Sequence, residues 1–221
     1  MHQIRDRKCF IGGHCADALK AAAMGLVVLV FAGCAAGPSP QSGDATTEVT
    51  AAATSAKVRP EPAAMTPVQQ KQYDEARQRA SSGQTEEAIA ILAALQAERP
   101  DLAAVSARLA WLQQQHGNVE QAIELNKEAL DTDPGNEMAT NNLALLLQSK
   151  GEFKQAREYL DQGLSWHPDS PKLHYNLAVL SELYLLDLPS ALQHYQRYQT
   201  LEPNGSEQVK GWIADLQRRL N

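Results

Sequence analysis

The feature that most constrains this chain is a repeat of about 34 residues that runs through about residues 69–204. Three kinds of residue recur at this interval, each in its own column. Because three independent columns share one period, chance is a poor explanation, and a period of this length indicates a repeat architecture. The columns are Gly83, Gly117 and Gly151; Ala88, Ala122, Ala156 and then Ala191; and Pro100, Pro134, Pro168 and Pro203.

Each column has a physical role in a helical hairpin. A glycine at the end of a first helix can adopt a positive φ and cap that helix. An alanine early in a second helix lets the two helices approach closely, and a proline ends the second helix. Between these positions the apolar residues follow three- and four-residue steps, as in Leu143, Leu147, Leu160 and Leu164. Each repeat is therefore predicted to be a pair of antiparallel helices.

The period and its residue types resemble the tetratricopeptide repeat (TPR) family. The resemblance implies an all-α fold, a right-handed α-solenoid of about four helical hairpins with a C-terminal capping helix. The fourth unit departs from the pattern, since Leu185-Leu186-Asp187-Leu188 replaces the glycine turn and adds one residue. The expected TPR domain spans 66–221, with units at about 69–102, 103–136, 137–170 and 171–205 and a cap helix at 206–220.

The predicted cap helix has one apolar stripe, which includes Val209, Trp212 and Leu216. The ends of a solenoid need a helix whose outer side is solvated, and this stripe leaves the opposite side polar. We expect Trp212 to pack on the second helix of the fourth unit. A helix lying on a membrane surface is the alternative, supported only by two terminal arginines.

The start of the chain is predicted to be a signal peptide over residues 1–33. Its first 20 residues are net basic, and residues 21–32 are continuously apolar. Twelve residues make about 18 Å of helix, well short of a hydrocarbon core of roughly 30 Å. The run ends in Val30-Phe31-Ala32-Gly33-Cys34, which resembles the lipobox of bacterial lipoproteins. An uncleaved anchor, with Cys34 as an ordinary small residue, is the alternative.

The lipobox resemblance implies that Cys34 is lipidated, so that the mature protein is attached to a membrane by acyl chains. In that family an Asp directly after the cysteine favours retention at the inner membrane. Here that residue is Ala35, so the resemblance implies the outer membrane, with the protein facing the periplasm. Residues 34–65 then consist of the lipidated cysteine and a linker rich in Ala, Thr, Ser and Pro. Such a composition buries too little apolar surface to fold, and predicts a disordered spacer.

The composition and the missing motifs exclude several classes of function. Acidic residues outnumber basic ones by 26 to 20, and no basic block follows the leader, so we expect no nucleic-acid binding. Beyond Cys34 there is no cysteine, and no zinc-binding, phosphate-binding or dinucleotide-binding motif is present. His116, His167, His174 and His194 are expected to be surface or interface residues. We therefore predict a protein that is not an enzyme and has no cofactor and no metal.

In the TPR family the first helix of each hairpin lines a concave face that holds peptide or protein segments. Asn142 and Asn176 lie 34 positions apart, so they should recur on one ridge, where amides can pair with a peptide backbone. The alternative is that these asparagines tie neighbouring repeats together and that Trp111 packs between hairpins. The residues to which the resemblance assigns the protein-binding concave face are Arg108, Trp111, Asn141, Asn142, Leu145, Lys172, Tyr175, Asn176 and Val179.

These features together predict a non-catalytic, periplasm-facing TPR lipoprotein that serves as a scaffold or adaptor in a cell-envelope assembly. Its layout resembles small pilus-assembly and TonB-associated members of the family. The expected partners are protein or peptide segments of an envelope complex, with self-association left open. An adaptor that regulates a peptidoglycan hydrolase is the alternative within binding proteins, and a catalytic lipoprotein is the alternative from another class.

Overall fold

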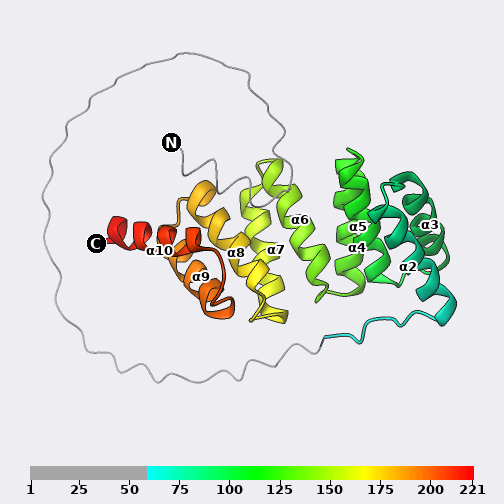
Figure 1. The fold of residues 1–221 in the computed structure, drawn as a ribbon, viewed down its shortest axis with the longest axis horizontal. Helices are drawn as coiled ribbons and strands as arrows, with labels where there is room; N and C mark the ends of the chain where they lie inside the picture. The colour runs from blue at the N-terminus through cyan, green and yellow to red at the C-terminus, as the bar shows by residue number, and fades with distance from the viewer. Residues whose placement is uncertain (1–58) are drawn as a thin grey trace, which may run out of the picture.

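The structure is a computed structural model that describes residues 59–221, and this part of the chain is a row of α-helices without a strand (Figure 1). The all-α repeat fold expected from the period is confirmed. Residues 1–58, which hold the predicted signal peptide, Cys34 and most of the predicted linker, lie outside the described part. The helices are α2 (Pro67–Ser81), α3 (Thr85–Glu98), α4 (Ala103–Gln115), α5 (Val119–Thr132), α6 (Glu137–Ser149), α7 (Phe153–Trp166), α8 (Pro171–Leu180), the π-helical turn η1 (Ser181–Leu185), α9 (Leu188–Leu201) and α10 (Glu207–Leu220).

The glycine column ends the first helix of three hairpins. Gly83, Gly117 and Gly151 have φ values of 80°, 90° and 82°, in the left-handed region that favours glycine. One residue later the backbone N–H donates to a carbonyl five residues earlier, as from Gln84 to Arg79 at 2.9 Å. This is the bond of a Schellman cap, which satisfies a carbonyl at the helix end and lets the chain reverse.

The fourth hairpin accommodates its extra residue in the π-helical turn η1, which follows α8. Leu186 takes the left-handed position, with φ 56°, and its side chain is exposed. The N–H of Asp187 donates to the carbonyl of Ser181 at 2.8 Å, six residues back rather than five. The carboxylate of Asp187 caps α9 at the N–H of Ser190 and accepts from Arg157 of α7 at 2.9 Å. The hairpin therefore closes without a glycine.

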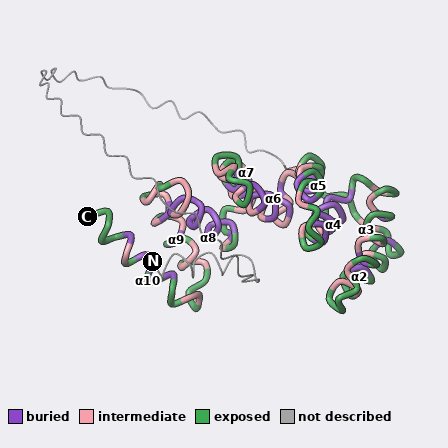
Figure 2. The backbone as a smooth tube through the Cα atoms, turned by 90° about the horizontal axis from the view of Figure 1, so that it is seen from above, coloured by how far each residue is buried: buried purple, intermediate pink, exposed green. Residues whose placement is uncertain are grey.

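The alanine column allows each hairpin to close tightly. Ala88, Ala122, Ala156 and Ala191 are all fully buried (0% exposed). Leucines from successive hairpins fill the space between the helix pairs, so buried residues face neighbouring helices while the outer surfaces are exposed (Figure 2). A single hairpin cannot bury its own apolar surface, so the stability of the domain depends on the stacking of successive hairpins.

Helix α10 caps the C-terminal end of the row, as the apolar stripe predicts. Trp212 is 5% exposed, and its ring centroid lies 5.5 Å from that of Tyr195 on α9. Val209, Ile213 and Leu216 join the same core. Among the helices that the structure describes, none has the length and apolarity that crossing a membrane would require.

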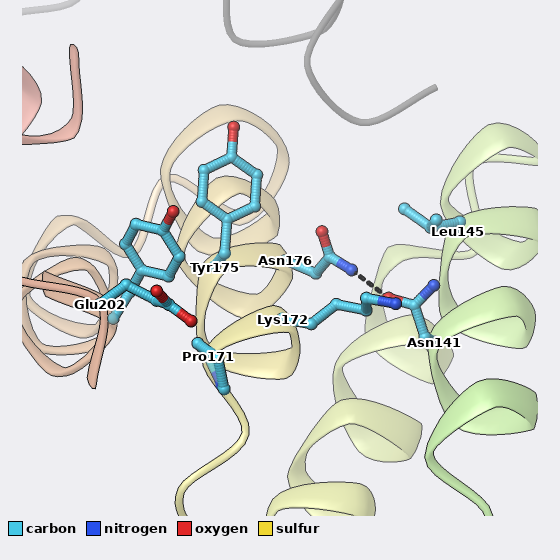
Figure 3. Close-up of a pocket in the computed structure, with 8 residues that line it drawn as sticks. Asn141, Leu145, Pro171, Lys172, Tyr175, Asn176 and Glu202 are labelled. Atoms are coloured by element: carbon cyan, nitrogen blue, oxygen red, sulfur yellow. Dashed lines mark hydrogen bonds between the residues drawn. The ribbon is translucent and has the colours of Figure 1, made fainter. Parts of the chain in front are cut away.

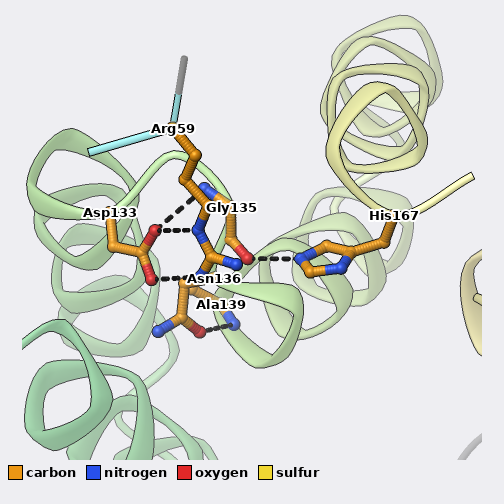
Figure 4. A network of polar contacts seen from close by, with 6 residues as sticks. All are labelled: Arg59, Asp133, Gly135, Asn136, Ala139 and His167. Carbon is orange, nitrogen blue, oxygen red and sulfur yellow. Dashed lines mark hydrogen bonds and ion pairs between the residues drawn. The ribbon is translucent and has the colours of Figure 1, made fainter. Parts of the chain in front are cut away.

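The segment before α2 is attached to the array, so the predicted linker is too long at its C-terminal end. Arg59 donates to both carboxylate oxygens of Asp133, at 2.9 and 2.7 Å, in the loop between α5 and α6 (Figure 4). Met65 packs against the core of the first two hairpins. Residues 59–66 therefore run along the edge that carries the loops between repeats (Figure 1). Composition did not predict this contact, because one long-range ion pair leaves no local signal.

The site that holds Arg59 depends on a missing side chain as well as on charge. Asp133 is 4% exposed and also accepts from the N–H of Gly135 at 3.1 Å. A Cβ atom added at Gly135 would overlap the guanidinium group of Arg59. The carbonyl of Gly135 lies 2.6 Å from Nε2 of His167, in the next loop between repeats (Figure 4). The contact thus joins the N-terminal segment to two successive loops.

Replacing Arg59 with Ala should release residues 59–65 and lower the free energy of unfolding by about 1–2 kcal/mol, because the buried carboxylate of Asp133 loses its cation. Gly135→Ala should release the same segment without changing any charge. Faster hydrogen exchange of amides 59–65 in both variants, together with urea unfolding, would check this prediction.

The control is Lys127→Ala, which breaks an exposed ion pair with Glu124 and should cost at most about 0.5 kcal/mol. Unchanged exchange of amides 59–65 in both Arg59→Ala and Gly135→Ala would contradict the assigned contact.

Candidate functional site

The candidate site lies on the face formed by the first helices of the hairpins. Helix α4 contacts α6, and α6 contacts α8, so that the first helices of three successive units lie against one another. Corresponding residues on these helices are 34 positions apart. Side chains that point away from the paired second helices therefore form ridges along one surface, which we call the first-helix face. Two hollows open on it.

The first hollow has a volume of about 450 Å³ and lies between α6, α8 and the end of α9 (Figure 3). We call it the amide hollow, because two asparagines form its floor. Lys172 and Glu202 supply one charge of each sign at its exposed rim. Five of the predicted binding residues are among those that line it, which are Asn141, Leu145, Pro171, Lys172, Tyr175, Asn176, Tyr198 and Glu202.

Asparagines of adjacent repeats are bonded to each other in this hollow. Nδ2 of Asn176 donates to Oδ1 of Asn141 at 2.5 Å, which joins α8 to α6 (Figure 3). Asn142 and Asn176 keep equivalent positions on α6 and α8, and the bonded partner of Asn176 is the preceding residue of α6, Asn141. The amide bond favours the alternative that Asn176 ties two repeats together. Asn142 is 6% exposed, and its Nδ2 atom has no acceptor among the described residues.

Two other predicted binding residues are mostly or wholly inside the core. Val179 is 0% exposed and packs in the cluster that contains Trp212 of α10, so the cap helix removes it from the surface. Tyr175 is 5% exposed, with its ring centroid 5.4 Å from that of Tyr198. Only the edge of Tyr175 reaches the amide hollow. The first-helix face available to a partner therefore ends before the last turn of α8.

The second hollow, of about 520 Å³, lies between α2 and α4, and we call it the arginine hollow. Trp111 is 36% exposed, and the guanidinium carbon of Arg108 lies 5.7 Å from the centre of its ring. Trp111 is therefore partly open to solvent, rather than packed between hairpins as the alternative expected. The lining residues are Asp74, Arg77, Gln78, Ala80, Ser81, Arg108 and Trp111.

Sequence reasoning missed several lining residues. Asp74 and Arg77 lie 34 positions before Arg108 and Trp111, so the repeat register alone could have found them. Tyr198 and Glu202 come from α9 and the residue after it, and no register signal places a second helix beside this face. Their position follows from how the fourth hairpin packs against α8.

The histidines of the fourth hairpin form a structural pair. The Nδ1 atoms of His174 and His194 are 2.9 Å apart, and Nε2 of His174 lies 2.9 Å from the carbonyl of Pro168. Burial, and to a lesser extent the charge of a protonated His174, lower the pKa of His194 to about 4. At neutral pH the His194 side chain is therefore uncharged, and its contact with His174 joins α8 to α9. Within residues 59–221, no group of three or more His, Cys, Asp or Glu side chains is placed to hold a metal ion.

Comparison with known proteins agrees with this geometry. A family model described as tetratricopeptide repeat matches residues 79–146 and 115–180. MamA of Desulfovibrio magneticus RS-1 has a TM-score of 0.59 at 16% identity, over 71% of this chain and 87% of that one. PilF of Pseudomonas aeruginosa has a TM-score of 0.61 at 22% identity, over 68% of each chain. A search of curated proteins found no match.

The bond between Asn141 and Asn176 can be measured with a double-mutant cycle. We expect Asn141→Ala and Asn176→Ala to couple by about 0.5–1.5 kcal/mol in urea unfolding, because either change alone already removes the hydrogen bond. The matched control is the cycle of Asn118→Ala with Asn176→Ala, which should be close to additive because Asn118 bonds Gln113 and shares no partner with Asn176. A coupling of zero in the first cycle would mean that these amides do not tie the repeats together.

Proposed function

Because the chain is a tetratricopeptide repeat protein, we propose that it binds an extended segment of a partner protein along the first-helix face. Proteins of this fold are in general non-catalytic scaffolds for protein–protein interaction. The observation that carries the proposal is that both hollows open on the same face, with one repeat junction between them. Both combine polar side chains with aromatic or apolar ones, as sites that fix the backbone and one or two side chains of a peptide do.

We further propose that the protein is a lipoprotein of the outer membrane, attached through Cys34 and facing the periplasm. The support is the order of features in residues 1–35, namely a basic start, a short apolar run, the small residues Ala32 and Gly33, then Cys34 and Ala35. Residues 35–58 supply a spacer rich in small and polar residues before the ordered array. Several acyl chains hold such a protein on a membrane stably.

An anchored array with a binding face acts as a scaffold or adaptor, and we place it in a cell-envelope assembly of the pilus, secretion or TonB type. The arrangement of leader, spacer and four hairpins supports this proposal. The solved structures support only its fold, because their identity to this chain is low. The lipid anchor would keep the first-helix face within one spacer length of the membrane.

The anchor is tested by metabolic labelling with a fatty-acid analogue. We expect the wild-type protein to incorporate the label and Cys34→Ala to lose it, because the thiol of Cys34 is the acylated atom. Cys15→Ala is the matched control and should keep the label, since the leader that contains it is removed. Label that persists in Cys34→Ala would contradict the lipoprotein proposal.

Partner binding is tested by cross-linking in cells and identification of the captured proteins. Lys172 is exposed at the rim of the amide hollow, so Lys172→Glu should reduce capture of the main partner severalfold by reversing a charge in the groove. Lys154→Glu makes the same charge change on α7, outside both hollows, and should leave capture unchanged. Equal capture by the two variants would show that the partner binds elsewhere.

A further inference from the structure

We propose that the arginine hollow is a subsite for an acidic residue of the partner segment, followed by an apolar one, with Arg108 binding the carboxylate and Trp111 contacting the apolar side chain. The proposal rests on the proposed binding function and adds the chemistry that selects the partner. Four observations about the described residues carry it.

Arg108 lacks the acidic partner that neighbouring arginines have. On α2, Arg77 lies 3.5 Å from Asp74, and Arg79 is paired with both Glu75 and Glu87. No ion pair joins Arg108 to an acidic residue within 59–221, and its Nε atom is buried without an acceptor. The Nε atom itself is out of reach of a partner, but the side chain as a whole is partly exposed, so a carboxylate in the hollow can pair with the exposed part of the guanidinium group.

The hollow is locally positive on an acidic protein. Its charged lining residues are one acid, Asp74, and two bases, Arg77 and Arg108, whereas the whole chain has a net charge of -6. Asp74 is already neutralised by Arg77 and accepts from Gln70 at 3.1 Å. The unbalanced charge is therefore that of Arg108, and it complements an anionic group.

Trp111 both orients Arg108 and offers apolar surface. The guanidinium of Arg108 lies 5.7 Å from the ring centre, close enough for a cation–π contact that restricts its position. Since 36% of Trp111 stays exposed, part of the ring is available to an apolar side chain next to the bound carboxylate. Tryptophan and arginine are both enriched among the residues that dominate binding energy in protein interfaces.

The equivalent position in the next repeat also has an unused donor. Asn142 follows Arg108 by 34 positions, is 6% exposed, and leaves Nδ2 without an acceptor among the described residues. In the repeat after that, the corresponding donor, Nδ2 of Asn176, is used by Asn141. Buried donors without an acceptor thus occupy equivalent positions in two successive repeats, whereas the third repeat satisfies its donor internally.

The experiment uses the full chain in detergent micelles and an array of short synthetic peptides with random flanks. Each peptide is made in three versions, with Glu, Gln or Lys at the centre, followed by Leu. We expect the Glu versions to bind about tenfold more tightly than the Gln versions, because the carboxylate forms a charge-assisted pair. Binding should shift the indole N–H signal of Trp111, which Trp111→Phe identifies by its loss.

Arg108→Gln should reduce the preference for Glu over Gln to about one. The matched control is the double change Asp74→Asn with Arg77→Gln, which removes a paired acid and base from the same hollow and should keep most of the preference. The Arg108→Glu variant should instead bind the Lys versions of the peptides more tightly. This reversal tests the proposal even if the Arg108→Gln variant folds poorly. Equal binding of Glu and Gln versions by the wild type would overturn the inference. So would an equal loss in that double variant and in Arg108→Gln, or an unmoved Trp111 signal.

These outcomes separate the inference from the function on which it rests. If cross-linked partners are lost in Lys172→Glu but peptides show no preference for Glu, then only the acidic subsite is wrong. If Lys172→Glu and Lys154→Glu capture partners equally and no peptide shifts Trp111, then binding along the first-helix face is wrong as well.

Discussion

The structure depends on the close approach of two helices at a buried alanine, repeated once in every hairpin. Ala88, Ala122, Ala156 and Ala191 have no exposed surface, and a larger side chain at any of them would push the paired helices apart. Because each hairpin is narrow, its leucines extend beyond the pair and are buried only by the next hairpin. The core is thus a chain of contacts between neighbours, and α10 ends that chain with Val209, Trp212 and Leu216.

This stacking also decides where a partner can bind. The first helices contact one another across repeats, so their outward side chains form a continuous surface. Of the second helices, the end of α9 reaches this surface, beside the amide hollow. The cap helix limits that surface by burying Val179, and the Asn141–Asn176 bond uses one amide donor and one amide acceptor that a ligand would otherwise meet. What remains for a partner is the amide hollow and the arginine hollow.

The N-terminal segment adds a constraint that does not come from stacking. Arg59 binds a buried carboxylate in the loop between the second and third units, so the chain joins the array near its middle rather than at the free end of α2 (Figure 4). Within our proposal, the spacer from Cys34 would then hold the array by its loop edge. The contact reaches His167 through Gly135, and it therefore links the attachment point to the third unit, whose α6 lines the amide hollow.

The sequence by itself determined the period, the hairpins and their ends, because glycine, alanine and proline act locally through φ, side-chain size and the missing N–H. It also placed Arg108, Trp111, Asn141 and Lys172 on one face, since a 34-residue register keeps equivalent side chains aligned. Only the tertiary structure decided which of them are exposed, which asparagines are bonded and where Arg59 docks. Those outcomes depend on contacts between residues that are about 35 to 74 positions apart, for which a single sequence carries no local signal.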